Sequence, residues 1–440
     1  MKKDMMELCA WVIDQAKKAG ANDSRTRFSR TRSVEIGYRE RKPETITEAT
    51  SQSVVLQLFV DGRYSSQSTA DLRKTALTDF VSGAVAMTRL IAKDQFRSLP
   101  DPKYYAGRAT IDLKLNDADY QKWSPEQRHQ VVKALENACL EAGGQSVISV
   151  EASTRDYFSE QAAMASNGCD GYQETTDYVL VAGMTAKDEG DRRASGYDYA
   201  VSRYVKSFPD PAAVGRSAAQ RTLAMRGGKK LKTETLPIIL ENRGVSRILG
   251  GLISAMSGPN VQQKRSFVMD KKGQKIGSDA LTIMDDPHLV GGFGSALYDN
   301  EGMATRKRTF IEAGVLKDFY IDWYYSRKLG CEPTVVGPTN LVIPPGKRSI
   351  EQIMKDLGRG ILVNDFIGGN SNSTTGDFSV GISGFLFENG KPTQTVAEMN
   401  VADNHLKFWG KLVEAANDPW PYSAWMTPSL VFKDVVVSGV

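Results

Sequence analysis

The chain has 440 residues, of which 41% are hydrophobic and 25% are charged, a composition typical of globular proteins and unlike that of disordered chains. Its 56 basic and 52 acidic residues leave a net charge of +4, without the large basic excess of a dedicated nucleic-acid binder. The four cysteines lie far apart along the chain, so they indicate neither a zinc ribbon nor a disulfide scaffold.

The first twenty residues predict an amphipathic helix, with Met5, Leu8, Val12 and Ile13 on one stripe. Asp4, Glu7 and Asp14 interrupt any apolar signal sequence. No apolar run of about eighteen residues, the length that spans a membrane, occurs in the chain. We therefore expect a cytoplasmic protein without a membrane span.

Residues 24–42 predict strands, because arginines alternate with other residues there. The arginines of this segment are Arg25, Arg27, Arg30, Arg32, Arg39 and Arg41. We favour a solvated basic face over a functional anion site, since charged residues at a sheet edge also block unwanted strand pairing.

Turn and helix signals follow. Asp61-Gly62, after the β-prone run 54–60, predicts a hairpin. Ser68 or Thr69 is expected to cap a helix over about 70–92, in which Leu90 would face inward. Residues 99–107 have the composition of a linker.

Three further signals complete the amino-terminal half. Ser124, Pro125 and Gln127 predict a capping box at the start of a second helix. Residues 147–185 predict antiparallel strands, and Asp210-Pro211 predicts the start of another helix.

Residues 227–234 predict a domain boundary, because glycines and lysines separate a finished helix from a new apolar run. The expected fold is α+β. An amino-terminal domain of helices and antiparallel sheet covers 1–226, with a candidate sub-boundary near 99–107. A β-rich carboxy-terminal domain covers 235–440, with hairpins expected at 310–321 and 385–396.

Few residues indicate a reactive site. His129, His288 and His405 each lack a second histidine or cysteine nearby, so a structural role is expected for each rather than zinc ligation. The chain contains neither a P-loop nor a G-x-S-x-G nucleophile elbow. The polar, glycine-rich segment 364–381 is expected to be a long loop, which either carries function or is a plain surface loop.

Several segments of the chain resemble the TldD/PmbA metalloprotease family, also called modulators of DNA gyrase. The matching segments are NEGMATRKRTFIEAGVLKDFYIDWYYSRKLG (300–330), GDFSVGISGFLFENGK (376–391) and TPSLVFKDVVVSG (427–439). The order of helix, basic strands and hairpin at the amino terminus also fits. The resemblance covers nearly the whole chain and implies the fold of that family.

The resemblance also implies which branch of the family this is. TldD-type chains carry an H-E-x-x-x-H motif and a late cysteine that bind a metal, and PmbA-type (TldE) chains lack both. In this sequence the corresponding windows are residues 246–258, without His, Glu or Cys, and residues 417–429, without Cys. The PmbA-type branch is therefore expected, with no catalytic residue, no metal ligand and no cofactor. Residues 246–258 themselves predict a buried helix, which Ser246 is expected to cap and Ser257-Gly258-Pro259 to end.

By this resemblance, we expect a subunit that pairs with a TldD-type metalloprotease subunit, acts on unfolded peptides and forms a homodimer when alone. A surface for pairing is expected at Phe319, Tyr320, Trp323, Tyr324 and Tyr325. Part of the glycine-rich segment is expected to border the peptide cleft. These residues are Gly368, Gly369, Asn370, Asn372, Thr375, Gly376 and Asp377.

Two alternatives remain open. The chain is a self-standing hydrolase if carboxylates converge on a metal, the candidates being Asp285, Asp286, Asp365 and Asp377. It is a non-enzymatic interaction protein, bearing on DNA gyrase, if neither a site nor a protease partner exists. The sequence carries no motif that supports this second alternative.

Overall fold

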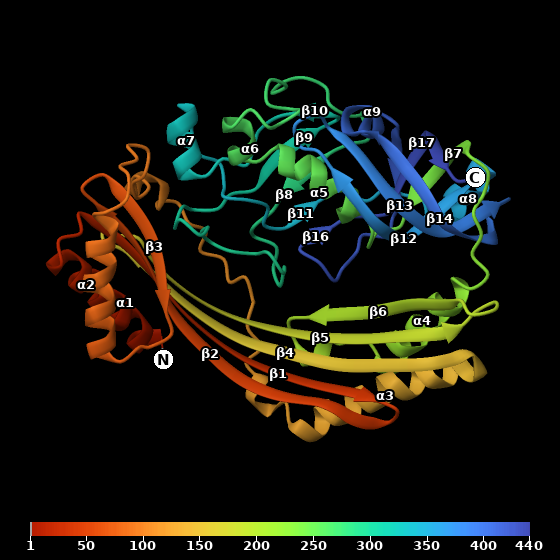
Figure 1. Ribbon diagram of the computed structural model, residues 1–440, viewed down its shortest axis with the longest axis horizontal. Helices are drawn as coiled ribbons and strands as arrows, with labels where there is room; N and C mark the ends of the chain where they lie inside the picture. Colours follow the sequence, from red (N-terminus) through yellow and green to blue (C-terminus); the bar gives the residue numbers. More distant parts are fainter. Residues whose placement is uncertain (1) are drawn as a thin grey trace.

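The computed structural model describes residues 2–440 and contains three sheets (Figure 1). The first sheet has six antiparallel strands in the order β3-β2-β1-β4-β5-β6 and curves beneath the carboxy-terminal half. Its strands are β1 (Asp23–Arg39), β2 (Lys42–Val60), β3 (Arg63–Thr69), β4 (Val147–Ala165), β5 (Asp170–Lys187) and β6 (Arg193–Ser202).

All four long helices of the amino-terminal half cover one face of this sheet. They are α1 (Lys2–Lys18), α2 (Lys74–Thr88), α3 (Pro125–Gly143) and α4 (Pro211–Ala224). Phe28 of β1 packs in the core beneath α1 and α2, and Ile36 of β1 packs in the core beneath α3 and α4. Because side chains of a strand alternate between faces, these two even-numbered positions lie on one face, and Arg25 and Arg27 lie on the other.

Local sequence signals account for several element boundaries. Ser124 and Gln127 form the predicted capping box of α3, and the Asp210 carboxylate caps α4 by accepting from Ala212 N. Asp61 and Gly62 take positive φ angles of 50° and 77°, as a two-residue hairpin turn requires. The predicted antiparallel strands over 147–185 are also confirmed, as β4 and β5.

The carboxy-terminal half contains the two other sheets. The larger one has the order β14-β13-β12-β7-β17-β15, and β14 also pairs with β17. Its strands are β7 (Glu234–Leu240), β12 (Arg359–Ser371), β13 (Asp377–Glu388), β14 (Lys391–Asn404), β15 (Leu412–Ala415) and β17 (Leu430–Ser438). The smaller sheet consists of β8 (Ile283–Asp285), β9 (Arg308–Glu312), β10 (Val315–Leu316), β11 (Leu341–Val342) and β16 (Trp425–Met426).

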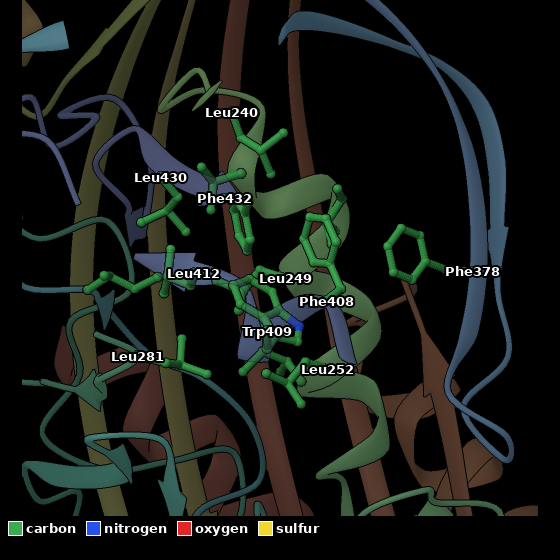
Figure 2. Packing of buried hydrophobic residues seen from close by; sticks show 14 of the residues in the cluster. Leu240, Leu249, Leu252, Leu281, Phe378, Phe408, Trp409, Leu412, Leu430 and Phe432 are labelled. Atoms are coloured by element: carbon green, nitrogen blue, oxygen red, sulfur yellow. The ribbon is translucent and has the colours of Figure 1, made fainter. Parts of the chain in front are cut away.

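Five short helices accompany these sheets. They are α5 (Val245–Ala255), α6 (Gly258–Gln262), α7 (Trp323–Leu329), α8 (Ile350–Leu357) and α9 (His405–Gly410). Leu249 and Leu252 of α5 are fully buried and point toward Trp409 and Phe432 (Figure 2). Burying side chains of this size stabilises the fold by about 1.5–3 kcal/mol each. The core thus holds α5 in place over its whole apolar face.

The two hairpins predicted in this half are confirmed. β9 and β10 pair around Ala313-Gly314, and β13 and β14 pair around Asn389-Gly390. Asn389 and Gly390 take φ angles of 51° and 82°, those of the expected turn type.

Three sequence-based expectations are wrong. The helix expected over 70–92 begins only at Lys74, because Ser68 and Thr69 extend β3, and Leu90 is 85% exposed. The basic segment is not a sheet edge, since β1 pairs with β2 on one side and with β4 on the other. The segment 364–381 is not a long loop either, because β12 and β13 extend through most of it.

The aromatic surface expected for pairing is used within the chain. Phe319 and Tyr320 are 8% and 2% exposed. Trp323 Nε1 donates to Ser98 Oγ over 2.9 Å, and Tyr324 OH donates to Asp94 Oδ2 over 2.8 Å. These residues therefore join α7 to the amino-terminal half. Separately, none of the helices within residues 2–440 has the length and apolar character needed to cross a membrane.

We propose that the chain forms two compact units that meet at residues 227–234. This segment links α4 to β7, and Lys229, Lys230 and Lys232 are exposed. Backbone hydrogen bonds such as Lys229 N to Thr395 O hold it, so cutting requires local opening. We expect trypsin to cut slowly after these lysines and to yield two resistant fragments, identified by mass spectrometry. Earlier cutting within 54–60 or 376–391 would contradict the proposal.

A buried ion pair stabilises the amino-terminal half. Arg128 and Asp156 are 2% and 0% exposed and are joined by two hydrogen bonds of 2.6 and 2.9 Å. Tyr120 OH also donates to Asp156 Oδ1, over 2.8 Å. Replacing Asp156 with alanine leaves the Arg128 charge buried and unpaired, so we expect a loss of about 3–5 kcal/mol of unfolding free energy in urea titrations.

The matched control for Asp156→Ala is Asp71→Ala. Asp71 also pairs with an arginine, Arg73, but on the solvated surface. Water replaces the lost partner there, so no measurable change in stability is expected. Equal effects of the two substitutions would show that burial does not set the contribution of the Arg128–Asp156 pair.

Candidate functional site

The window 246–258, which the resemblance assigns to the motif of TldD-type chains, forms most of helix α5. The predicted buried helix is confirmed: Ile248, Leu249, Leu252, Ile253 and Met256 are all 6% exposed or less. The helix starts after Gly244 without a side-chain cap, so the expected cap at Ser246 is wrong. Apolar packing, rather than polar groups, thus fixes the orientation of this helix.

A bulge shapes the hairpin of β12 and β13, which lies beside α5. Pairing skips from Ile367 to Asn370, and Gly368 and Gly369 take φ angles of 59° and 109°. Glycine has no Cβ and adopts such angles at little cost, so the ladder resumes at Asn370 opposite Ser379. The hairpin therefore continues as far as Ser371, where the sequence predicted a loop.

The tip of this hairpin is a polar turn over residues 372–376. Asn372 Oδ1 accepts from Thr374 N over 2.9 Å, and Gly376 has a φ angle of 85°. Asn404 Nδ2 donates to Asp377 Oδ1 over 3.0 Å, and this bond, followed by one from Thr375, holds the pKa of Asp377 below its usual range. The side chains of Asn372 and Asp377 thus stabilise the turn.

Helix α5 and the hairpin enclose a cavity of about 110 Å³. The polar residues at this cavity are Arg247, Asn370, Ser371 and His405, and Gly369 and Ile248 complete much of the wall. Arg247 Nη2 donates to Gly368 O over 2.5 Å and so ties the helix to the bulge. Of the seven predicted cleft residues, Gly369 and Asn370 line this cavity, and Gly368 contacts it through Arg247.

Ser371 and His405 form a hydrogen-bonded pair in this cavity, with Ser371 Oγ 2.9 Å from His405 Nε2. On the other side of the ring, Trp409 Nε1 donates to His405 Nδ1 over 3.3 Å. Because an indole N–H can only donate, Nδ1 is the acceptor and the ring proton lies on Nε2. His405 then donates to Ser371 and has no lone pair with which to deprotonate it.

The titration of His405 supports a structural role. Burial lowers the pKa of His405 to about 4, although Asp403 acts in the opposite direction. The ring also stacks on Phe267, with centroids 5.4 Å apart. His405 is therefore neutral at physiological pH and serves as packing and as a hydrogen-bond donor, unlike the base of a serine hydrolase.

Gly251 of α5 contacts this pair directly. A Cβ atom at Gly251 would overlap both His405 Nε2 and Ser371 Oγ, whereas a Cβ at Gly250 would meet nothing within 4 Å. The hairpin thus lies so close to α5 that no side chain fits at position 251. Arg247 was not expected from the sequence, because its contact with Gly368 joins segments more than a hundred residues apart.

The second window, residues 417–429, lies next to the start of α5. Ser429 Oγ accepts from Asn242 N over 2.9 Å, and Asp418 O accepts from Asn242 Nδ2 over 2.7 Å. The two segments that the resemblance implies as metal-binding in TldD-type chains are therefore neighbours in space.

The carboxylates of the hydrolase alternative do not form a metal site. Asp285 is buried, which raises its pKa to about 6, and accepts from Thr339 N, whereas Asp286 pairs with Lys307. Asp365 is exposed on β12. Throughout residues 2–440, no three His, Cys, Asp or Glu residues are grouped so as to hold a metal ion. His129 bonds to Tyr38 and His288 to Thr305, so both have structural partners.

Comparison with known proteins gives matches along nearly the whole chain. Three models of the PmbA/TldA metallopeptidase match: domain 1 at residues 26–88, the central domain at 119–226 and the C-terminal domain at 233–439. Metalloprotease PmbA from Escherichia coli O157:H7 is 28% identical over 415 residues, which cover 93% of this chain and 91% of that protein.

Solved structures agree with these matches. A Bacteroides thetaiotaomicron protein, described as a candidate modulator of DNA gyrase, is 38% identical with a TM-score of 0.96, and the match covers 99% of this chain and 98% of that chain. TldE from Thermococcus kodakarensis shares the fold, with a TM-score of 0.87 at 22% identity, over 98% of this chain and 100% of that chain. The chain therefore belongs to the PmbA/TldD metallopeptidase family.

Proposed function

We propose that the chain is the TldE/PmbA-like, non-catalytic subunit of a two-subunit metalloprotease that acts on unfolded peptides. Its partner would be a TldD-type subunit that supplies the metal and the residue that activates water. Membership in the family and the names of its relatives support the protease setting. The proposal places the complex in the cytoplasm, with the lone chain as a homodimer.

The observation that carries the proposal is the contact of α5 with the hairpin. The helix that corresponds to the motif-bearing window presents Gly251, where the neighbouring space is filled by Ser371 and His405. No His, Glu or Cys occurs in residues 246–258 to bind a metal or to activate water. A neutral hydrogen-bonded pair thus takes the place of charged ligands beside this helix.

The hairpin of β12 and β13 is the part we propose as a border of the peptide cleft. Ile367 is 53% exposed, and Gly369 and Asn370 line both the cavity beside α5 and an open groove on the other side of the hairpin. The bulge leaves the backbone accessible there without side chains in the way. Main-chain pairing at such a surface recognises a peptide largely independently of its sequence, which suits unfolded substrates.

The tautomer of His405 argues against a self-standing hydrolase that uses Ser371. A serine nucleophile needs a base that accepts its proton, and here the ring nitrogen next to Ser371 carries a proton instead. The other alternative, an interaction protein, rests on the description given to a relative. No contact within residues 2–440 favours it over the protease subunit.

The packing of Gly251 gives a direct prediction. Gly251→Ala should lower the unfolding free energy by about 1–3 kcal/mol, because the added methyl group must displace Ser371 or His405. Gly250→Ala is the matched control in the same helix. It should be neutral or stabilise by up to about 1 kcal/mol, since alanine has the higher helix propensity and the site is open. Urea denaturation of both variants measures the difference, and equal effects would contradict the packing.

Reconstitution tests the proposed function. The purified chain should contain no stoichiometric zinc by elemental analysis and should not cleave an unfolded fluorogenic peptide. Mixing with a TldD-type subunit should give a stable heterodimer by light scattering and chelator-sensitive cleavage. Tightly bound metal or cleavage by the lone chain would overturn the non-catalytic assignment, and a monomer mass for the lone chain would refute the homodimer.

Two variants of the hairpin test the cleft in the same mixture. Asn370→Tyr places a large side chain at the cavity mouth and should reduce cleavage without affecting assembly. Thr374→Tyr, in the exposed turn at the hairpin tip, is the control and should leave both unchanged. Unchanged cleavage by Asn370→Tyr in an assembled complex would show that the hairpin does not border the cleft.

A further inference from the structure

A cavity lined by several charged side chains lies between the first sheet and the carboxy-terminal half, away from α5. It has a volume of about 290 Å³, in the range of small ligand sites. Strands β1 to β4 form one wall of the cavity. Much of the opposite wall is formed by residues 298–302, by Asp322 and by Tyr324 of α7. Aromatic side chains, among them Phe59, Tyr64 and Tyr298, line the space between.

Charges of both signs line this cavity in equal number. They are Arg25, Arg27, Arg97, Asp299, Glu301 and Asp322. Within residues 2–440, none of these six side chains forms a salt bridge, although all of them are at least half-buried. The cavity thus contains equal numbers of acidic and basic groups, none of them in a salt bridge within residues 2–440.

Neutral groups hold each of the three arginines in position. Arg25 Nε donates to Gln57 Oε1 over 2.7 Å, and Arg27 Nη2 donates to Asn300 O over 3.0 Å. The Arg97 guanidinium lies over the Tyr324 ring at 3.5 Å and the Tyr64 ring at 4.5 Å. The three positive charges are therefore fixed in space without a carboxylate partner.

The three acids are held in the same way, by backbone N–H groups. Asp299 Oδ1 accepts from Glu301 N over 2.8 Å, and Glu301 Oε2 accepts from Trp323 N over 2.8 Å. Asp322 Oδ1 accepts from Tyr325 N over 2.7 Å. In each case one oxygen is anchored, and the second oxygen forms no salt bridge.

Some comparably shielded charges elsewhere in the chain form ion pairs. Arg221 and Glu241 are joined over 2.7 Å, and Arg243 and Asp198 over 2.8 Å. A buried charge without a partner costs free energy, so proteins retain such groups where a ligand or a mechanism uses them. Two atoms at this cavity stand out in this respect: Arg25 Nη1 and Asp299 Oδ2 are buried and have no hydrogen-bond partner in the described chain.

The titration behaviour of the cavity agrees with this geometry. Burial raises the pKa of Asp299 to about 6 and that of Glu301 to about 7, although backbone N–H groups and Arg25 act in the opposite direction. Burial, and then repulsion from Arg25, lower the pKa of the Arg27 guanidinium. Arg25 thus offsets only part of the effect of burial on the two acids, and neither acid forms a salt bridge within residues 2–440.

We propose that this cavity binds a small zwitterion, an amino acid or a dipeptide that carries both a free α-ammonium and a free α-carboxylate group. The ammonium group would pair with Asp299 and Glu301, the carboxylate with Arg25 and Arg27, and an apolar side chain would contact the aromatic wall. A simple anion such as phosphate would leave the negative charges of the acids without a partner. A metal cation would leave the positive charges of the arginines without one. The proposal does not depend on the protease function.

Ligands with one blocked end test the proposal on the full-length chain. In calorimetric titrations at neutral pH, L-leucine or L-alanyl-L-leucine should bind, and the comparison between them shows which length fits. N-acetyl-L-alanyl-L-leucine lacks the ammonium, and L-alanyl-L-leucine amide lacks the carboxylate. Each should bind at least about tenfold more weakly, because it leaves one set of charges uncompensated.

Two variants locate the site, with a control on the same strand. Asp299→Asn keeps an acceptor for the backbone N–H of Glu301 but removes the charge, and Arg25→Gln removes one positive charge. Each should weaken binding of the zwitterion at least about tenfold. Arg32→Gln should leave it unchanged, since Arg32 pairs with Glu48 outside the cavity. Melting curves check that each variant is folded.

Either of two results would overturn the proposal. One is the absence of binding by both zwitterions to the unmodified chain. The other is equal binding of the blocked and unblocked dipeptides. The second comparison uses the natural sequence alone, so it decides the question even if a variant fails to fold.

Discussion

Strand β1 organises the molecule, because its alternate side chains must point to opposite faces of the first sheet. On one face, Phe28 and Ile36 join the two apolar cores beneath the helices. On the other face, Arg25 and Arg27 meet residues of the carboxy-terminal half. Because β2 and β4 hold β1 on both sides, a shift by one residue would exchange the two faces, so the apolar cores and the charged cavity depend on the same register.

In the carboxy-terminal half, apolar packing likewise fixes the orientation of α5. Its apolar face is buried against Trp409 and Phe432, and this packing sets the rotation of the helix. That rotation brings Gly251 to the hairpin, where Ser371, His405 and Trp409 form a chain of hydrogen bonds. The hydrophobic core therefore determines which residue of the family's motif window faces the candidate cleft.

Local signals made much of the fold predictable from the sequence. The capping box at Ser124, the Asp61-Gly62 turn and the apolar periodicity of 246–258 each act within a few residues, and each is found in the structure. The extension of the hairpin through Ser371 depends on pairing with Phe378 and on a glycine bulge, and no local signal distinguishes this from a polar loop. The resemblance supplied the family, as the comparisons show.

The charged cavity could not be predicted from the sequence either, because no local signal indicates it. Its residues range from Arg25 to Asp322, and each looks like an ordinary surface charge in its own segment. Even the arginine-rich strand was interpreted as a protected edge, because the strand that covers its second side, β4, begins more than a hundred residues later. Only the folded chain brings the two sets of charges together.

The contact at Gly251 also constrains how this chain can change. Placing a histidine or glutamate in α5 would not by itself create a metal site, because a side chain at Gly251 overlaps Ser371 and His405. Those two residues would have to be replaced at the same time, and Trp409 would then lose the acceptor for its indole N–H. The positions are thus epistatic: single substitutions toward a ligand lower stability before any coordination is gained. The proposed non-catalytic state would therefore be difficult to leave by single steps.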